Sequence, residues 1–303
     1  MWRGSAPGLL DRLRTNGIYA THLKLLQPHP RLIEEMYRYT QTRLMEFGNR
    51  PMWWLTPRYY ALCPAAFLLL IGEGDSAGRD VTASLKALKG PSNPALGEPG
   101  QLRYDFDAQN IVMCVVHTSE STVEVLREAC LFFSQTELDE AIEAAIDLRR
   151  SGRVPNGIDE RPLHTGTIDV DVHNFFSLMC SIQRRLLGLI DASGAADAED
   201  ALEEAERAAR RTDGYRQRAA LTDDLWRQVA GVPERANDAA GEPALALLRA
   251  LSNPASFFPI LADELIRSLH QHSIELSPWD ELLLETGLAF HQLQIAGFSP
   301  NPT

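Results

Sequence analysis

One apolar segment, Pro64–Ile71, constrains the fold of this chain most strongly, because all of its side chains are apolar and Gly72-Glu73-Gly74 follows directly. This pattern is typical of a β-strand that is buried on both faces. A partner strand is expected at Ile18–Leu26, after a helix around Leu9–Leu13 that stops at Asn16-Gly17. The two segments together predict a sheet that is covered by helices.

Further elements are expected between and after these strands. The sequence predicts a helix from Pro30 that extends at most to Phe47, an irregular aromatic-rich hairpin or loop at Arg50–Cys63, a helix at Asp80–Lys89, a short buried strand at Ile111–Val116, and a helix that runs to Phe133. Ser121 and Glu124 have the spacing of a capping box at the start of this last helix.

Beyond Thr136 the pattern becomes mainly helical. Helical apolar spacing is found at Leu138–Arg150, Ala195–Arg211, Leu245–Leu251, Phe257–His270 and Pro278–Ile295. We therefore expect an α+β domain over residues 1–135 and a mainly α-helical domain of unknown role over residues 136–303, joined through the polar region Ser151–Asp159. Thr167–His173 is an exception, since its apolar and polar residues alternate as in a half-exposed strand.

Charge and composition exclude some classes of partner. A formal net charge of -12 repels a polyphosphate backbone, so nucleic acid is not expected as a partner, whereas a small phosphorylated ligand needs only a local basic pocket. The longest apolar run is far shorter than the ~20 residues that span a bilayer, and no membrane association is expected. Each of the four cysteines has an apolar neighbour, which favours buried free thiols in a reducing cytoplasm over disulfides or zinc.

The most specific local signal is His117, which opens the run His117-Thr118-Ser119-Glu120-Ser121 between a predicted strand and a capped helix. A histidine in this place lies near a helix N-terminus, where free N–H groups favour anions. Its imidazole can act as a nucleophile toward a phosphoryl group when an acceptor holds one ring nitrogen. Glu128, on the helix that follows, is the candidate for that acceptor.

Several short motifs resemble those of the nucleoside diphosphate kinases. Cys114–Ser121 is similar to the family's N-x-x-H-G-S-D-S, Ser92–Pro94 to T-N-P, and Pro99–Phe106 to P-G-T-I-R-G-D-F. Arg50-Pro51 and the aromatic residues after it look like R-P-F-F, and Leu23–Pro28 looks like the exit of the strand before the family's second helix. The matches occur in the family's order and with similar spacing, which makes them stronger together than any one alone.

The resemblance implies a ferredoxin-like sheet with covering helices and a role for each matching residue. His117 receives the phosphate and Glu128 orients it; Lys86, Ser92 and Arg103 bind phosphates; Met52, Trp53 and Tyr37 bind the base or ribose. It also implies nucleoside di- and triphosphates as ligands, Mg²⁺ carried with the nucleotide, and a homo-oligomer.

Two departures from the family's motifs keep a second hypothesis open. No counterpart of the family's opening strand and its K-P-D lysine is found, and Cys114 stands where the family has a sugar-contacting asparagine. The alternative to a phosphotransferase is therefore a catalytically weakened nucleotide-binding or scaffolding module, whose helical half binds a partner. A missing central strand leaves backbone groups unpaired, so we hypothesise that Thr167–Val172 or another chain fills the gap.

Overall fold

The computed structural model describes residues 6–39, 52–73, 80–164, 174–190, 195–230, 242–252 and 262–295. The chain forms two compact units that alternate along the sequence. The first unit contains residues 1–90, 99–106 and 115–170, and the second contains residues 91–98, 107–114 and 171–303. A domain boundary at residue 135 stays a prediction.

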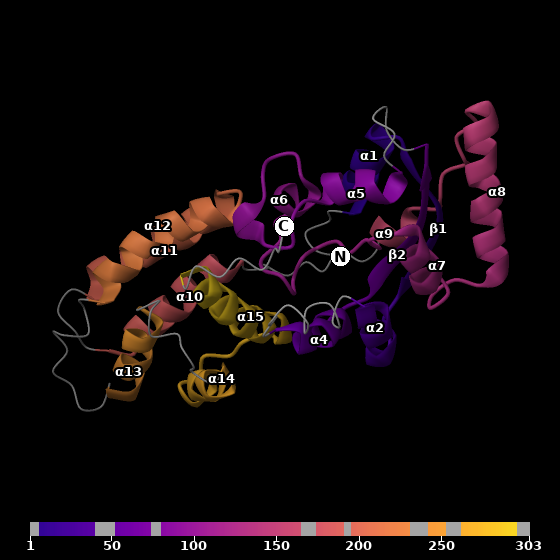
Figure 1. Ribbon diagram of the computed structural model, residues 1–303. Helices are drawn as coiled ribbons and strands as arrows, with labels where there is room; N and C mark the ends of the chain where they lie inside the picture. The colour runs from indigo at the N-terminus through magenta and orange to yellow at the C-terminus, as the bar shows by residue number, and fades with distance from the viewer. Residues whose placement is uncertain are drawn as a thin grey trace. The chain divides into compact units, whose positions relative to one another are not determined.

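The first unit is built on two antiparallel strands, β1 (Ile18–Leu26) and β2 (Ala65–Gly72), which confirm the two predicted strands (Figure 1). Their pairing has one irregularity, between Ala20 and His22. Glycine is required at the end of β2, because a Cβ at Gly72 would lie 2.8 Å from the carbonyl oxygen of Gly17. The turn before β1 therefore fits closely against the end of β2.

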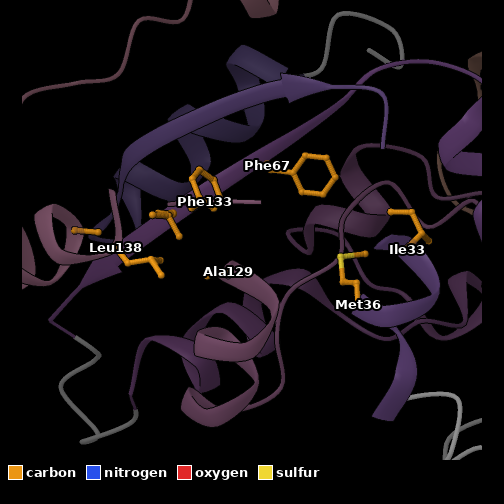
Figure 2. Close-up of a cluster of buried hydrophobic side chains, with 8 residues drawn as sticks. Ile33, Met36, Phe67, Ala129, Phe133 and Leu138 are labelled. Atoms are coloured by element: carbon orange, nitrogen blue, oxygen red, sulfur yellow. The ribbon is translucent and has the colours of Figure 1, made fainter. Parts of the chain in front are cut away.

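One face of this sheet packs against α2 (Pro30–Met36), α7 (Thr122–Ala129) and α8 (Gln135–Ser151). Phe67 and Leu69 of β2 project to this face, where Figure 2 shows Phe67 in a cluster with side chains from the three helices. The buried members of the cluster are Ile33, Met36, Phe67, Leu69, Ala129, Phe133, Leu138 and Ala141. This core fixes α7 against the sheet and thereby positions the acidic and basic side chains that α7 carries.

The opposite face packs against α1 (Ala6–Thr15), α5 (Val81–Lys89), α6 (Leu102–Asp105) and α9 (Arg161–His164). Its buried members are Ala6, Leu10, Leu13, Ile18, Leu85, Leu102 and Leu163, and Leu68 and Leu70 of β2 pack against them. Alternate residues of β2 thus contact different clusters, as expected for a strand covered on both faces. The strand predicted from the apolar run is confirmed, although the residues that face this second cluster, such as Leu68 and Leu70, are only half-buried.

Two predictions for the first unit's connections are wrong. The segment after residue 51 is helical, with η2 (Trp53–Leu55) and α4 (Thr56–Ala61), rather than an irregular loop or hairpin. Pro57 stands in the first turn of α4, where a missing N–H removes no helical hydrogen bond. The helix α7 ends at Ala129 rather than Phe133, and tighter turns follow it, in which the N–H of Leu131 donates to the carbonyl oxygen of Glu128 before Phe133 enters the core.

The predicted strand at Ile111–Val116 is also wrong. Oδ1 of Asn110 accepts hydrogen bonds from the backbone N–H groups of Val112 and Met113, each at 2.9 Å. Val115 has a left-handed backbone with a φ of 65°. Local side-chain bonds of this kind compete with a sheet ladder for the same donors, so the apolar side chains are buried without forming a strand.

The second unit is helical, and α10 (Phe175–Leu187) is central to it. This helix packs against α11 (Ala195–Arg211), α12 (Tyr215–Ala230), α13 (Glu242–Leu251) and α15 (Pro278–Ile295), while α14 (Ala262–Gln271) packs against α15 and η3 (Pro94–Leu96) packs against α12. The segment 107–114 is tied to these helices by the bond from Asn110 Nδ2 to Thr286 Oγ1, at 2.9 Å. The helices predicted at 195–211 and 278–295 are confirmed.

Three further predictions concern the cysteines, one alternating segment and membrane-spanning helices. All four cysteines are free thiols, as expected, and Cys114 and Cys180 are buried, but Cys63 is half-buried and Cys130 is exposed at the end of α7. The alternating segment Thr167–His173 lies outside the described residues. None of the helices in the described ranges is long and apolar enough to cross a membrane.

Candidate active site

His117 lies on the connection into α7 and is partly buried, with 16% of its side chain exposed. The connection is held on both sides of the histidine. Before it, the carbonyl oxygen of Val116 accepts a hydrogen bond from Arg103 Nη2 at 3.0 Å. After it, the side chain of Ser121 accepts a hydrogen bond from the N–H of Glu124 and caps α7. The imidazole therefore stands on a fixed backbone.

The imidazole of His117 is paired with a buried carboxylate. Its Nε2 lies 3.0 Å from Oε2 of Glu128, a buried acidic residue of α7. The same Oε2 accepts a hydrogen bond from Ser119 Oγ at 2.8 Å, and Oε1 accepts one from Arg127 Nη2 at 3.0 Å. With its Nε2 engaged by Glu128, His117 makes no hydrogen bond through Nδ1 to any residue in the described ranges.

Tyr37 lies against the imidazole at the end of α2, and the two ring centroids are 4.6 Å apart. Its hydroxyl lies 3.3 Å from that of Tyr60 on α4. The position of Tyr37 is linked to the carboxylate, because Arg127 also donates to the carbonyl oxygen of Met36 at 2.9 Å. The helices α2 and α7 thus share the hydrogen bonds that fix this site.

Two of the predicted phosphate-binding residues, Arg103 and Lys86, lie next to this connection. The buried guanidinium of Arg103 donates to the carbonyl oxygens of Gly90, at 3.2 Å, and Val116. It therefore holds the backbone before the histidine. The side chain of Lys86 is 67% exposed and its Nζ lies 3.1 Å from Oε2 of Glu120, three residues after the histidine.

The other predicted binding residues are placed differently. Ser92 belongs to the second unit and His117 to the first, and a phosphate-binding role for Ser92 stays a prediction. Met52 is 1% exposed and packs in the interior, so it presents little surface to a base. Trp53 lies in η2, but its side chain is outside the described part of the structure. A base- or ribose-binding role for these residues stays a prediction.

Lys89, a further residue of the site, was not singled out from the sequence. Lys89 is buried, and its Nζ donates to Thr118 Oγ1 at 2.8 Å and lies 3.6 Å from Oε1 of Glu120. The signal that could have found Lys89 is its position four residues after Leu85, which places both side chains on the inner face of α5. A lysine on a buried helix face needs a partner, and Glu120 provides it.

Comparisons with known proteins identify the family of this chain. A family model described as nucleoside diphosphate kinase matches residues 3–138. A nucleoside diphosphate kinase of Synechococcus elongatus is 30% identical over 138 residues, which cover 46% of this chain and 83% of the relative. Nucleoside diphosphate kinase 3 of Homo sapiens is 29% identical over 130 residues, covering 43% of this chain and 69% of the relative.

A third relative, a nucleoside diphosphate kinase of Halalkalibacterium halodurans, is 41% identical over 63 residues, or 21% of this chain and 42% of the relative. The chain belongs to the nucleoside diphosphate kinase family. Membership of this kinase family supports an enzyme, and it confirms the resemblance seen in the motifs. The family match ends at residue 138, so α9–α15 lie outside the nucleoside diphosphate kinase region.

Proposed function

We propose that this protein is a nucleoside diphosphate kinase-like phosphotransferase that moves the terminal phosphate of a nucleoside triphosphate through a phosphohistidine at His117. The pairing of His117 Nε2 with the buried Glu128 carboxylate, at 3.0 Å, carries this proposal. A carboxylate in this position holds the proton on Nε2 and directs the lone pair of Nδ1 to the substrate. The family assignment supports the same chemistry.

The proposed transfer has two steps, and His117 takes part in both. In the first step, Nδ1 forms a bond to the terminal phosphorus while the bond from that phosphorus to the bridging oxygen breaks, and the nucleoside diphosphate leaves with the electron pair. The positive charge that develops on the imidazole is stabilised by Glu128. In the second step, an oxygen of an acceptor diphosphate takes the phosphoryl group and restores neutral His117.

Cations must offset the charge of the migrating phosphate. Lys86 and Arg103 are the candidates from this chain, together with Mg²⁺ bound to the nucleotide phosphates. No three His, Cys, Asp or Glu side chains of the described residues are grouped so that they could hold a metal ion. As the family resemblance implies, the proposal treats Mg²⁺ as part of the nucleotide substrate.

The proposal includes the finer features that the family implies. These are a ferredoxin-like sheet to which β1 and β2 contribute, a cytoplasmic location and assembly into a homo-oligomer. The antiparallel pairing of β1 with β2 and the helices on both of its faces support the sheet. Base or ribose binding by Tyr37 stays a prediction, and its ring, 4.6 Å from that of His117, is also placed to hold the imidazole.

The test is phosphorylation by ATP labelled on its terminal phosphate. We expect acid-labile label on the wild-type protein and none on His117→Ala. His22→Ala is the matched control, because Nε2 of His22 also pairs with a carboxylate, Glu140, at 3.1 Å in the same unit. Label that persists in His117→Ala, or that disappears in His22→Ala alone, contradicts the proposal.

The second candidate is a nucleotide-binding or scaffolding module that has lost efficient turnover. The replacement of the family's asparagine by Cys114 favours it, because the thiol is buried and is a weak hydrogen-bonding group. Tight binding of ATP by the wild-type protein without any acid-labile label would favour this module over the phosphotransferase.

A further inference from the structure

Lys89 is an unusual residue for the inner face of a helix, because only 5% of its side chain is exposed. An ammonium group is costly to remove from water unless anions or acceptors surround it. Its Nζ donates to Thr118 Oγ1 at 2.8 Å and lies 3.6 Å from Oε1 of Glu120. Both partners belong to the connection that carries His117.

Lys86 reaches the same carboxylate from one turn earlier on α5. Its Nζ lies 3.1 Å from Oε2 of Glu120, so each oxygen of this carboxylate faces a different lysine. Burial raises the pKa of Glu120, but the charges of Lys89 and Lys86 and the hydrogen bond from Lys86 outweigh it, and the pKa lies below its ordinary value. The carboxylate is therefore an anion held by two cations.

This two-lysine site is close to the reacting histidine. Thr118, which binds Lys89, directly follows His117, and Glu120 stands three residues after His117. A phosphate group has the same requirement as the carboxylate, namely cationic donors around anionic oxygens, but it carries more charge. A nucleotide phosphate that approaches His117 can thus compete with the Glu120 carboxylate for binding to the two lysines.

The backbone allows this carboxylate to leave. The N–H of Glu120 donates to Oε2 of Glu124 at 2.9 Å, and Ser121 caps α7, so the backbone is held independently of the two lysines. Rotation of the Glu120 side chain would withdraw its carboxylate from both ammonium groups without moving this backbone. We propose that Lys86 and Lys89 form a phosphate-binding site, that Glu120 occupies this site in the nucleotide-free protein, and that nucleotide phosphate displaces it.

This inference rests on the proposed function, because it takes a nucleotide phosphate as the ligand, and it adds Lys89 as a binding residue and Glu120 as an internal competitor. The decisive variant is Glu120→Gln, which keeps the side chain's shape and removes its charge. The apparent Kd of a ligand is inversely proportional to the fraction of sites that are open. Because Glu120 closes most of the sites, its removal should tighten ligand binding about five- to tenfold. If the ion pair has only a structural role, Glu120→Gln should not bind the ligand more tightly.

The measurement is the Kd of Mg-ATP and of inorganic triphosphate by titration calorimetry, with circular dichroism melting to check folding. We expect Glu120→Gln to bind both ligands about five- to tenfold more tightly. Lys89→Met should bind both about tenfold more weakly, since it removes a charge-assisted hydrogen bond. Lys24→Met and Glu137→Gln are the controls, because Lys24 Nζ and Glu137 Oε2 form a comparable pair at 2.8 Å on the same unit.

The outcomes separate this inference from the proposed function. Unchanged or weaker binding by Glu120→Gln, while the wild-type protein still forms acid-labile phosphate, overturns the inference alone. Tighter binding of inorganic triphosphate by Glu120→Gln without any phosphohistidine supports the phosphate site and contradicts the phosphotransferase. If neither ligand binds to the wild-type protein or to either variant, both proposals fail.

Discussion

At the scale of single residues, the carboxylate of Glu128 combines three hydrogen bonds on one buried group. It accepts from His117, Ser119 and Arg127, so its charge is fixed beside the imidazole rather than shared with water. Glu128→Gln keeps the size of this side chain but removes the charge that stabilises a phosphorylated imidazolium. We expect the rate of histidine phosphorylation to fall on the order of 10²-fold, as measured by rapid-quench labelling with ATP.

Glu140→Gln is the matched control for this change. Oε2 of Glu140 lies 3.1 Å from Nε2 of His22, yet the Glu140 side chain is largely exposed. An exposed pair of this kind contributes little, so the labelling rate should stay near that of the wild-type protein. Wild-type labelling by Glu128→Gln in a protein that melts normally would mean that Glu128 has no part in the transfer.

The sequence could predict the pair of His117 and Glu128, because a motif marked the histidine and the glutamate lies on the predicted helix that follows it. It could not predict that Lys89 shares the carboxylate of Glu120, since a lysine at a helix end is usually solvated. Nor could it place Arg103, whose guanidinium donates to two backbone carbonyl oxygens. Such contacts depend on tertiary packing, which a single sequence does not encode locally.

At the scale of elements, prediction succeeded where the pattern and its boundaries agreed. Ile18–Leu26 and Pro278–Ile295 have clear patterns with nearby turn or proline signals, and both are found with these bounds. The helix α10 was not predicted, because ten of its thirteen residues are buried and its only exposed or half-buried positions, Ser181, Arg184 and Arg185, all lie from its middle residue onward. Ile111–Val116 was misassigned because an apolar run does not distinguish a strand from buried irregular backbone.

The packing of α10 against α15 gives a prediction at this scale. A Cβ at Gly287 of α15 would lie 2.0 Å from Cδ2 of Phe175, so the two helices approach closely only with glycine at this position. Alanine is favoured over glycine by about 1 kcal/mol in an exposed helix. Here the clash with a fully buried ring outweighs that gain, and we expect Gly287→Ala to lower the free energy of unfolding by about 1–3 kcal/mol.

Urea unfolding followed by circular dichroism measures this effect. Gly188→Ala is the control, because Gly188 ends α10 with a φ of -63° and its added Cβ would meet other atoms only at 3.7 Å or more. That variant should unfold within about 0.5 kcal/mol of the wild-type protein. Equal midpoints for Gly287→Ala and Gly188→Ala would contradict the close approach of the two helices.

At the scale of the whole molecule, acid should weaken the folded state through one buried histidine. His291 is 4% exposed, lies among the rings of Phe175, Phe176 and Trp226, and its Nδ1 is 2.9 Å from the hydroxyl of Tyr215. Burial lowers the pKa of His291 from 6.5 to about 4. The folded chain therefore keeps this imidazole neutral at pH values where the unfolded chain is protonated.

The direction of the pH effect follows from these two pKa values. Above pH 6.5 the imidazole is neutral in both states and its contribution to stability is fully present. As the pH falls through 6.5, the unfolded chain binds a proton that the folded chain does not, so the free energy of unfolding decreases until the pH reaches about 4. A pKa lowered by about 2.5 corresponds to a total loss of about 3 kcal/mol.

The acidic surface acts in the opposite direction, but mainly at lower pH. Protonation of carboxylates reduces the repulsion that a net charge of -12 creates, and ordinary carboxyl groups bind protons near pH 4, below most of the range in which His291 matters. As the pH is lowered from 7.5 to 5, the urea midpoint of the wild-type protein should therefore decrease. The midpoint of His291→Gln should decrease less over the same range. Parallel pH profiles for the two proteins would show that His291 is protonated as readily in the folded chain as in the unfolded one.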